Sequence, residues 1–98
     1  MNTILTTQLF KVWLAGLRDS KAKVRIARRI ERAEQGNFGD HKHVGGAIWE
    51  MRIDYGPGYR LYYAGQGNCL YILLCGGDKS AQQEDIRCAQ ELWEQIHG

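Results

Sequence analysis

The stretch 49–63, WEMRIDYGPGYRLYY, constrains the fold most strongly, because it has the pattern of a strand, a tight turn and a second strand. In its first arm, apolar and charged residues alternate with period 2, as in a strand with one buried face. Gly56-Pro57-Gly58 has turn composition, since proline fixes one φ and glycine reaches positive φ. If the apolar sets face one core, then Arg52, Arg60 and Tyr62 stand together on the opposite face as a small basic and aromatic platform.

Apolar periodicity in the rest of the chain predicts helices and strands in the order β-α-α-β-β-β-α. The second helix begins at a cap formed by Asp19-Ser20, and the last helix has a possible capping box of Ser80 with Gln83. Residues 38–46 have the composition of a polar loop. The predicted elements are strand 4–5, helix 8–18, helix 20–35, strands 47–55, 59–64 and 69–75, and a helix after residue 80. We expect an α+β fold, an antiparallel sheet with two N-terminal helices and one C-terminal helix packed on it.

The length of 98 residues predicts one small domain spanning 1–98. No apolar run approaches the roughly 20 residues of a membrane span, and the N-terminus lacks the charged and apolar regions of a signal peptide. We therefore expect no membrane association and a cytoplasmic location. The net charge of +2 is unevenly distributed. Residues 1–63 hold 11 Lys and Arg against 6 Asp and Glu, a net +5, and residues 64–98 have a net −3. The basic part suggests an anionic partner.

Basic residues of the second helix contribute to this asymmetry. Lys21, Arg25, Arg28 and Arg32 follow one another at helical spacing and form one cationic stripe. Such a stripe is either a solvated face or a surface that contacts an anionic partner. The three cysteines and three histidines do not have zinc-site spacing, and Arg52 separates one candidate pair of carboxylates, Glu50 and Asp54. We expect neither a metal nor a cofactor.

Six short motifs together resemble a known family. They are Trp13–Arg18, Ala27–Ile30, Gly36–Asp40, Glu50–Ile53, Gly56–Arg60 and Leu74–Lys79. In this order, they resemble the RelE/ParE/HigB superfamily of toxins from bacterial type II toxin–antitoxin systems. The chain is most similar to the phage-derived HigB-like branch, described as addiction module killer proteins.

The resemblance implies a compact sheet like that of microbial ribonucleases, and a cognate antitoxin that often carries a helix-turn-helix domain. RelE-like and HigB-like members cleave mRNA on the ribosome, whereas ParE-like members act on DNA gyrase. We expect a metal-independent endoribonuclease, an mRNA interferase whose partners are the ribosome, mRNA and the antitoxin. The alternatives are a ParE-like gyrase inhibitor and a toxin remnant that acts only through its antitoxin complex.

The resemblance also assigns site residues. Arg60 matches the arginine that RelE-like enzymes use near the scissile phosphate, and Arg52 matches a strand lysine of that site. Lys79 lies near the position of another catalytic basic residue of those enzymes. The planar fork of arginine suits a phosphate that gains charge during 2′-hydroxyl attack. Tyr62 is positioned to stack on a base. We expect the cationic stripe, with Arg25, Arg28 and Arg32, to contribute to RNA binding.

The sequence departs from RelE at two positions, where Glu50 replaces a strand lysine and Ile86 replaces a tyrosine of the last helix. Another group must then transfer protons, and His43, His41 and Lys42 are the candidates, because histidine titrates near neutral pH. We expect His43 to be catalytic and Lys42 to bind RNA.

Each basic residue also has a structural alternative. Arg52 can pair with Glu50 or Asp54, Arg60 can protect a strand edge from aggregation, and Lys79 can be a surface charge.

Overall fold

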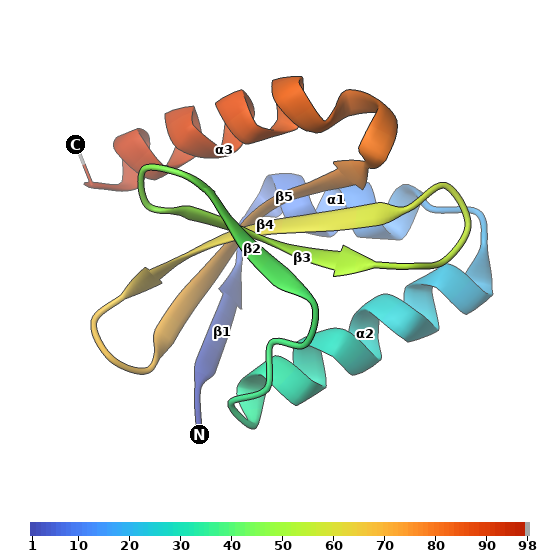
Figure 1. The fold of residues 1–98 in the computed structure, drawn as a ribbon, viewed down its shortest axis with the longest axis horizontal. Helices are drawn as coiled ribbons and strands as arrows, with labels where there is room; N and C mark the ends of the chain where they lie inside the picture. Colours follow the sequence, from blue (N-terminus) through green and yellow to red (C-terminus); the bar gives the residue numbers. More distant parts are fainter. Residues whose placement is uncertain (98) are drawn as a thin grey trace.

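The computed structural model describes residues 1–97 as one mixed sheet with three helices (Figure 1). Strands follow the order β1-β5-β4-β3-β2, with β1 parallel to β5 and the other pairs antiparallel. The elements are β1 (Thr3–Thr6), α1 (Gln8–Gly16), α2 (Ser20–Glu34), β2 (His41–Gly45), β3 (Ile48–Ile53), β4 (Tyr59–Gln66), β5 (Leu70–Asp78), the 3-10 turn η1 (Lys79–Ala81) and α3 (Gln82–His97). The predicted α+β class is confirmed.

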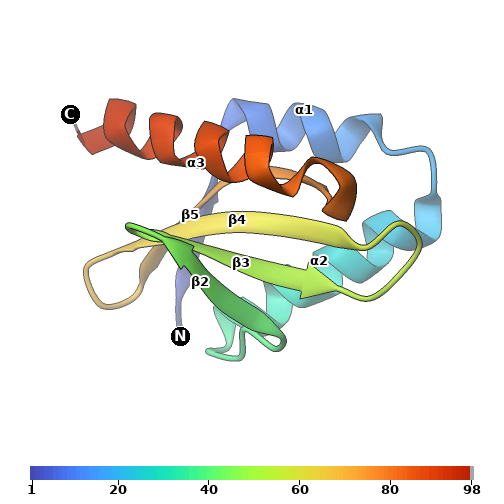
Figure 2. The same ribbon diagram turned by 45° about the horizontal axis from the view of Figure 1, so that its top comes forward.

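The sheet has a hydrophobic core on each face. Helices α1 and α2 cover one face, where Phe10 and Ile26 pack against Met51, Leu61 and Leu73. Helix α3 covers the other face, and its core contains Ile48, Tyr62, Ala64, Leu74 and Ala89. Figure 2 shows α3 and α2 on opposite sides of the sheet. Because β5 supplies residues to both cores, it reads as apolar on both faces, as predicted for a covered central strand.

Side-chain caps start the two N-terminal helices where the sequence places them. The Thr7 hydroxyl accepts a hydrogen bond from Phe10 N, and the Asp19 carboxylate accepts from Lys21 N and Ala22 N. Asp19 also accepts a hydrogen bond from the Tyr55 hydroxyl, which is the main reason that the pKa of its carboxyl lies below the ordinary value. None of the helices in residues 1–97 has the length and apolar character that a bilayer crossing requires.

The largest differences from the predicted elements lie at β2 and between β5 and α3. Residues 41–45 form β2, an edge strand, instead of part of a polar loop, because their backbone pairs with β3. Strand β5 continues to Asp78, whose side chain caps η1 by accepting from Ser80 N. Helix α3 begins at Gln82, after η1, and the side-chain cap before these helical turns is Asp78 instead of Ser80.

Candidate functional site

Arg52 and Arg60 lie directly opposite each other on β3 and β4. Side chains at opposed positions of an antiparallel pair lie on the same face of the sheet and close together. Their neighbours in the register are Glu50 and Tyr62, which also form an opposed pair. Since Tyr62 belongs to the core under α3, both arginines lie on the α3 face. The predicted grouping of the two guanidinium groups on one face is confirmed.

A buried carboxylate holds the two arginines together. Glu50 is 1% exposed, and its oxygens lie 3.8 Å from Nε of Arg52 and 3.7 Å from Nε of Arg60. The Gln82 side chain of α3 donates a 3.0 Å hydrogen bond to the same carboxylate. Opposed like charges destabilise a sheet, and the carboxylate between them offsets this repulsion. Glu50, one of the two positions where the sequence departs from the RelE pattern, is thus the centre of the cluster.

Both guanidinium groups reach the surface in part. The Arg52 side chain is 36% exposed and also lies 3.5 Å from the Asp40 carboxylate, whereas the Arg60 side chain is 16% exposed. Their Nε atoms are buried. Within residues 1–97, neither of these Nε atoms donates a hydrogen bond of regular geometry. Arg52 thus has the predicted acid pair with Glu50, but its side chain also keeps an open side.

Two predicted lysines lie at the border of this cluster. Lys42 is opposite Glu50 in the register of β2 and β3, so it shares the face of the arginines, and it is exposed. Lys79 follows β5, and its backbone N–H donates to the Gly58 carbonyl at 2.9 Å. Its methylene groups lie beside Gly58, where an added Cβ would come within 3.3 Å of Cδ. Lys79 therefore lies over the β3–β4 turn, beside Gly58, which precedes Arg60 by two residues.

The prediction that Tyr62 stacks on a base is wrong for this structure. Tyr62 is fully buried, because α3 packs over its ring. Burial raises the pKa of its phenol well above the ordinary value. The Tyr62 hydroxyl and Oδ2 of Asp85 are both buried without a hydrogen-bond partner in the part of the chain that the structure describes. Tyr62 thus forms the floor of the cluster and offers no face to a ligand.

The structure also places His43 away from the two arginines. Since Lys42 points to the arginine face, its neighbours His41 and His43 point to the face covered by α2. The His43 ring lies 5.2 Å from that of Trp49, and its Nε2 is 2.7 Å from the Gly46 carbonyl oxygen. His43 therefore does not lie beside Arg52 and Arg60, and its catalytic role stays a prediction. Because the composition of 38–46 predicts a loop, the sequence does not indicate that successive side chains of 41–43 point to opposite faces of the sheet.

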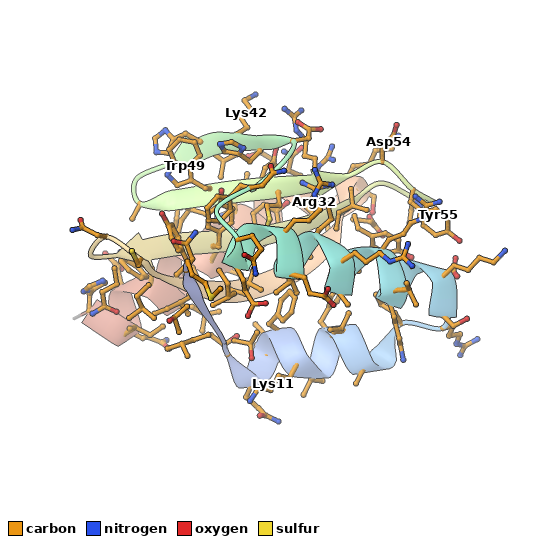
Figure 3. The ribbon with its side chains drawn as sticks, turned by 90° about the horizontal axis from the view of Figure 1, so that it is seen from below. Lys11, Arg32, Lys42, Trp49, Asp54 and Tyr55 are labelled. Atoms are coloured by element: carbon orange, nitrogen blue, oxygen red, sulfur yellow. The ribbon has the colours of Figure 1, made fainter. Side chains whose placement is uncertain are left out.

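The arginines of α2 form a second, separate basic surface. A groove of about 520 Å³ runs between α2 and the end of β3, on the face opposite to Arg52 and Arg60. Its cationic lining is Lys21, Arg25, Arg28, Arg29 and Arg32. Arg25 lies 4.6 Å over the Tyr55 ring, a cation–π contact. Figure 3 shows Arg32 on α2 and Tyr55 at the β3–β4 turn on the same side of the molecule. The predicted stripe thus borders a concave surface.

Sequence reasoning missed the role of Arg29. Its guanidinium donates to the backbone carbonyls of Phe38, Asp40 and Arg52, and so connects α2 to the 36–40 loop and to β3. Burial lowers the pKa of this guanidinium from its ordinary value. The only hint of this role in the sequence is the adjacent pair Arg28-Arg29. Arg28 belongs to the exposed stripe, so Arg29, the next residue of the helix, points toward the sheet.

Comparison with known proteins gives two similarities. Residues 13–94 match the family described as phage derived protein Gp49-like (DUF891). The chain is also 50% identical, over 93 residues, to a protein of Haemophilus influenzae described as uncharacterized. That alignment covers 95% of this chain and 94% of the relative. The family match includes Arg52, Arg60, Lys79 and all of α2.

Proposed function

The chain belongs to the phage-derived Gp49-like family, and we propose that it is the toxin of a type II toxin–antitoxin module that cleaves messenger RNA on the ribosome. The single observation that supports this most is the opposed Arg52–Arg60 pair with partly open guanidinium groups. The sequence motifs that resemble RelE and HigB toxins support it independently. The site of action is the cytoplasm, where the ribosome is.

The proposed reaction is attack of a 2′-hydroxyl on the adjacent phosphate. The 2′-oxygen–phosphorus bond forms and the bond to the 5′-oxygen breaks, which leaves a 2′,3′-cyclic phosphate and a 5′-hydroxyl. Arg52 and Arg60 bind the non-bridging oxygens and stabilise the charge of the pentacoordinate transition state. Glu50 contacts Nε of each arginine and leaves the outer nitrogens to the phosphate.

Proton transfer in this proposal uses exposed groups beside the arginines. Lys79 donates a proton to the departing 5′-oxygen from its position over the β3–β4 turn. Asp40, an exposed carboxylate 3.5 Å from Nε of Arg52, accepts the proton of the 2′-hydroxyl. The ribosome positions the message, so much of the rate comes from orientation.

The proposed partner is a cognate antitoxin, a small protein with a helix-turn-helix domain and an acidic segment. The uneven charge of this chain supports an acidic partner, because residues 1–63 have a net +5. We expect expression of the chain alone to arrest growth, and co-expression of the neighbouring reading frame to relieve the arrest. Normal growth under strong expression would support the toxin-remnant alternative instead.

A ParE-like inhibitor of DNA gyrase is the second candidate, favoured by the basic groove between α2 and β3. Primer extension on a message translated in a cell-free extract separates the two functions. We expect discrete cleavage ends with the wild-type chain, and unchanged supercoiling by purified gyrase at a large excess of it. An intact message together with inhibited gyrase would overturn the nuclease proposal and support the alternative.

A further inference from the structure

A second hollow lies on the face of the sheet opposite to Arg52 and Arg60. It has a volume of about 430 Å³, within the range of about 300–1,000 Å³ that is common for small-molecule sites. Aromatic side chains from the 36–40 loop and four strands line it: Phe38, His41, Trp49, Tyr63 and Tyr71. None of the cluster around Glu50 takes part, so this hollow is distinct from the proposed catalytic face.

The rings on one side of the hollow form a fixed wall. Phe38 stacks on Tyr63 with a centroid distance of 5.0 Å and an interplanar angle of 8°. Tyr71 meets Phe38 edge-on at 4.8 Å and Tyr63 at 6.1 Å. Tyr63 is buried and Phe38 and Tyr71 are partly exposed, so the wall is anchored in the core and open at its outer side.

The opposite side of the hollow presents Trp49 to solvent. Trp49 is 38% exposed, and the His41 and His43 rings flank it at 5.6 Å and 5.2 Å. One nitrogen of each histidine lies near a backbone carbonyl oxygen, of Gly39 for His41 and of Gly46 for His43. Within residues 1–97, the other nitrogen of each ring has no hydrogen-bond partner and can face a ligand.

Small residues keep the hollow open. Ala47, Gly65 and Gly67 line it between the two aromatic sides. Gly65 is opposite Tyr71 in the register of β4 and β5, and a Cβ there would come within 3.1 Å of the tyrosine ring. The glycine therefore lets the Tyr71 ring lie across β4, which shapes this end of the hollow.

Positive charge lies next to the hollow on the same face. Arg29 binds the carbonyls of Phe38 and Asp40, so the basic groove of α2 reaches the loop that carries Phe38. In Figure 3, Tyr55, Arg32 and Trp49 follow one another across one side of the molecule. An exposed aromatic platform beside a row of arginines is the arrangement by which proteins hold single-stranded nucleic acid.

We propose that the aromatic hollow takes an unstacked base of single-stranded RNA, while the α2 arginines bind the neighbouring phosphates. This inference deepens the proposed function, because it adds a binding site for the same substrate outside the catalytic face. Strand β2 is an edge strand, with Lys42 on the arginine face and His41 and His43 on the hollow face. One RNA strand can therefore cross β2 and contact both faces.

The test measures binding of a short fluorescein-labelled 2′-O-methyl RNA by fluorescence anisotropy with the full chain. The 2′-O-methyl group removes the attacking hydroxyl, so binding is measured without cleavage. We expect Trp49→Ala to weaken binding about 5- to 150-fold, the range for loss of one stacked base. Trp49→Phe keeps an aromatic face and is expected to retain most of the affinity. Arg32→Ala is expected to weaken binding and to reduce its salt dependence.

An abasic strand of the same length separates base stacking from phosphate binding. We expect Trp49→Ala to bind the abasic strand as the wild type does, whereas Arg32→Ala still weakens that binding. If folded Trp49→Ala binds the intact RNA as tightly as the wild type, the proposal is overturned, whatever the cleavage assay gives. A Trp49 effect without any message cleavage would keep the hollow as an RNA site and remove the nuclease function. The proposal would also be overturned if the hollow bound a side chain of a partner protein and Trp49→Ala left RNA binding unchanged.

Discussion

Glu50 determines how two arginines can stand side by side on this sheet. Its carboxylate is almost fully buried, contacts Nε of both arginines and accepts a hydrogen bond from Gln82. Without this negative charge, the opposed guanidinium groups would repel each other across the β3–β4 pair. The residue that lowers the positive potential of the site is also the one that makes its geometry possible.

We predict that Glu50→Gln lowers the free energy of unfolding by about 1–3 kcal/mol, because it keeps the shape and the Gln82 contact but removes the carboxylate partner of Arg60 and leaves Arg52 with Asp40 alone. The partial exposure of Arg52 limits this loss. Urea denaturation at neutral pH measures it. Asp54→Asn is the matched control, since Asp54 is exposed and should change stability by no more than about 0.5 kcal/mol. Equal stability of both variants would argue against the role of Glu50.

The partly buried carboxyl of Asp85, next to the same cluster, should make the stability of the fold depend on pH. Burial, followed by the charges of Asp78 and Glu84, raises the pKa of its carboxyl above the ordinary value of 3.8. As pH rises, the carboxyl therefore ionises more readily in the unfolded chain than in the folded one, and the wild type loses stability. We expect Asp85→Asn to gain stability relative to the wild type as pH rises from below 3.8, with a plateau above the raised pKa. A stability difference that does not change with pH would contradict this.

At the residue scale, alternation alone could place Arg52 and Arg60 on one face, because strand geometry fixes the side of every second residue. It could not show that Tyr62 is covered, since that depends on where α3 crosses β4. His43 was misplaced for a different reason. The sequence HKHVG has no apolar alternation, so nothing local indicated that it pairs with β3.

At the scale of elements, two adjacent glycines let helices approach both faces of β5. A Cβ at Gly76 would overlap the indole ring of Trp13 on α1, and a Cβ at Gly77 would overlap the Asp85 carboxylate on α3. Gly77 is also opposite Arg60 in the register of β4 and β5. The predicted strand 69–75 stops before these glycines, but both lie within β5, where they allow close packing.

We predict that Gly76→Ala lowers the free energy of unfolding by about 1–3 kcal/mol, the usual range for an overpacked core. Trp13 cannot move easily, because its ring packs against Phe10 and Tyr59. Gly77→Ala should lower the free energy of unfolding by less, because the Asp85 carboxylate can rotate away from the added methyl group. Urea denaturation of both variants measures the two losses. A larger loss for Gly77→Ala would mean that Asp85 is held more rigidly than Trp13.

The β2 strand marks the limit of prediction at this scale. Strongly periodic elements, such as α2 and the 49–63 hairpin, are visible in the sequence because each buries one regular face. An edge strand with exposed side chains at 41–43 gains its stability from backbone pairing with β3, which the sequence pattern does not record. The consequence is functional, because β2 decides which face Lys42 and His43 share.

At the scale of the whole molecule, positive charge lies on both faces of the sheet. Arg52 and Arg60 lie on the α3 face, and the groove of α2 lies on the other. Figure 2 shows the two helices on these opposite sides. The sequence could predict an excess of positive charge in residues 1–63, but not its division between two faces. In the proposed function, one face carries out the chemistry and the other holds the RNA.

The rate of message cleavage on purified ribosomes, under single-turnover conditions, tests the proposed role of the arginine pair most directly. We predict that Arg60→Ala slows cleavage about 10²–10³-fold, because it removes a donor that stabilises transition-state charge. Lys11→Ala removes one positive charge from the exposed side of α1 and is expected to cleave at the wild-type rate. Urea denaturation confirms that both variants fold. Cleavage by folded Arg60→Ala at the wild-type rate would contradict the assignment of this face as the catalytic site.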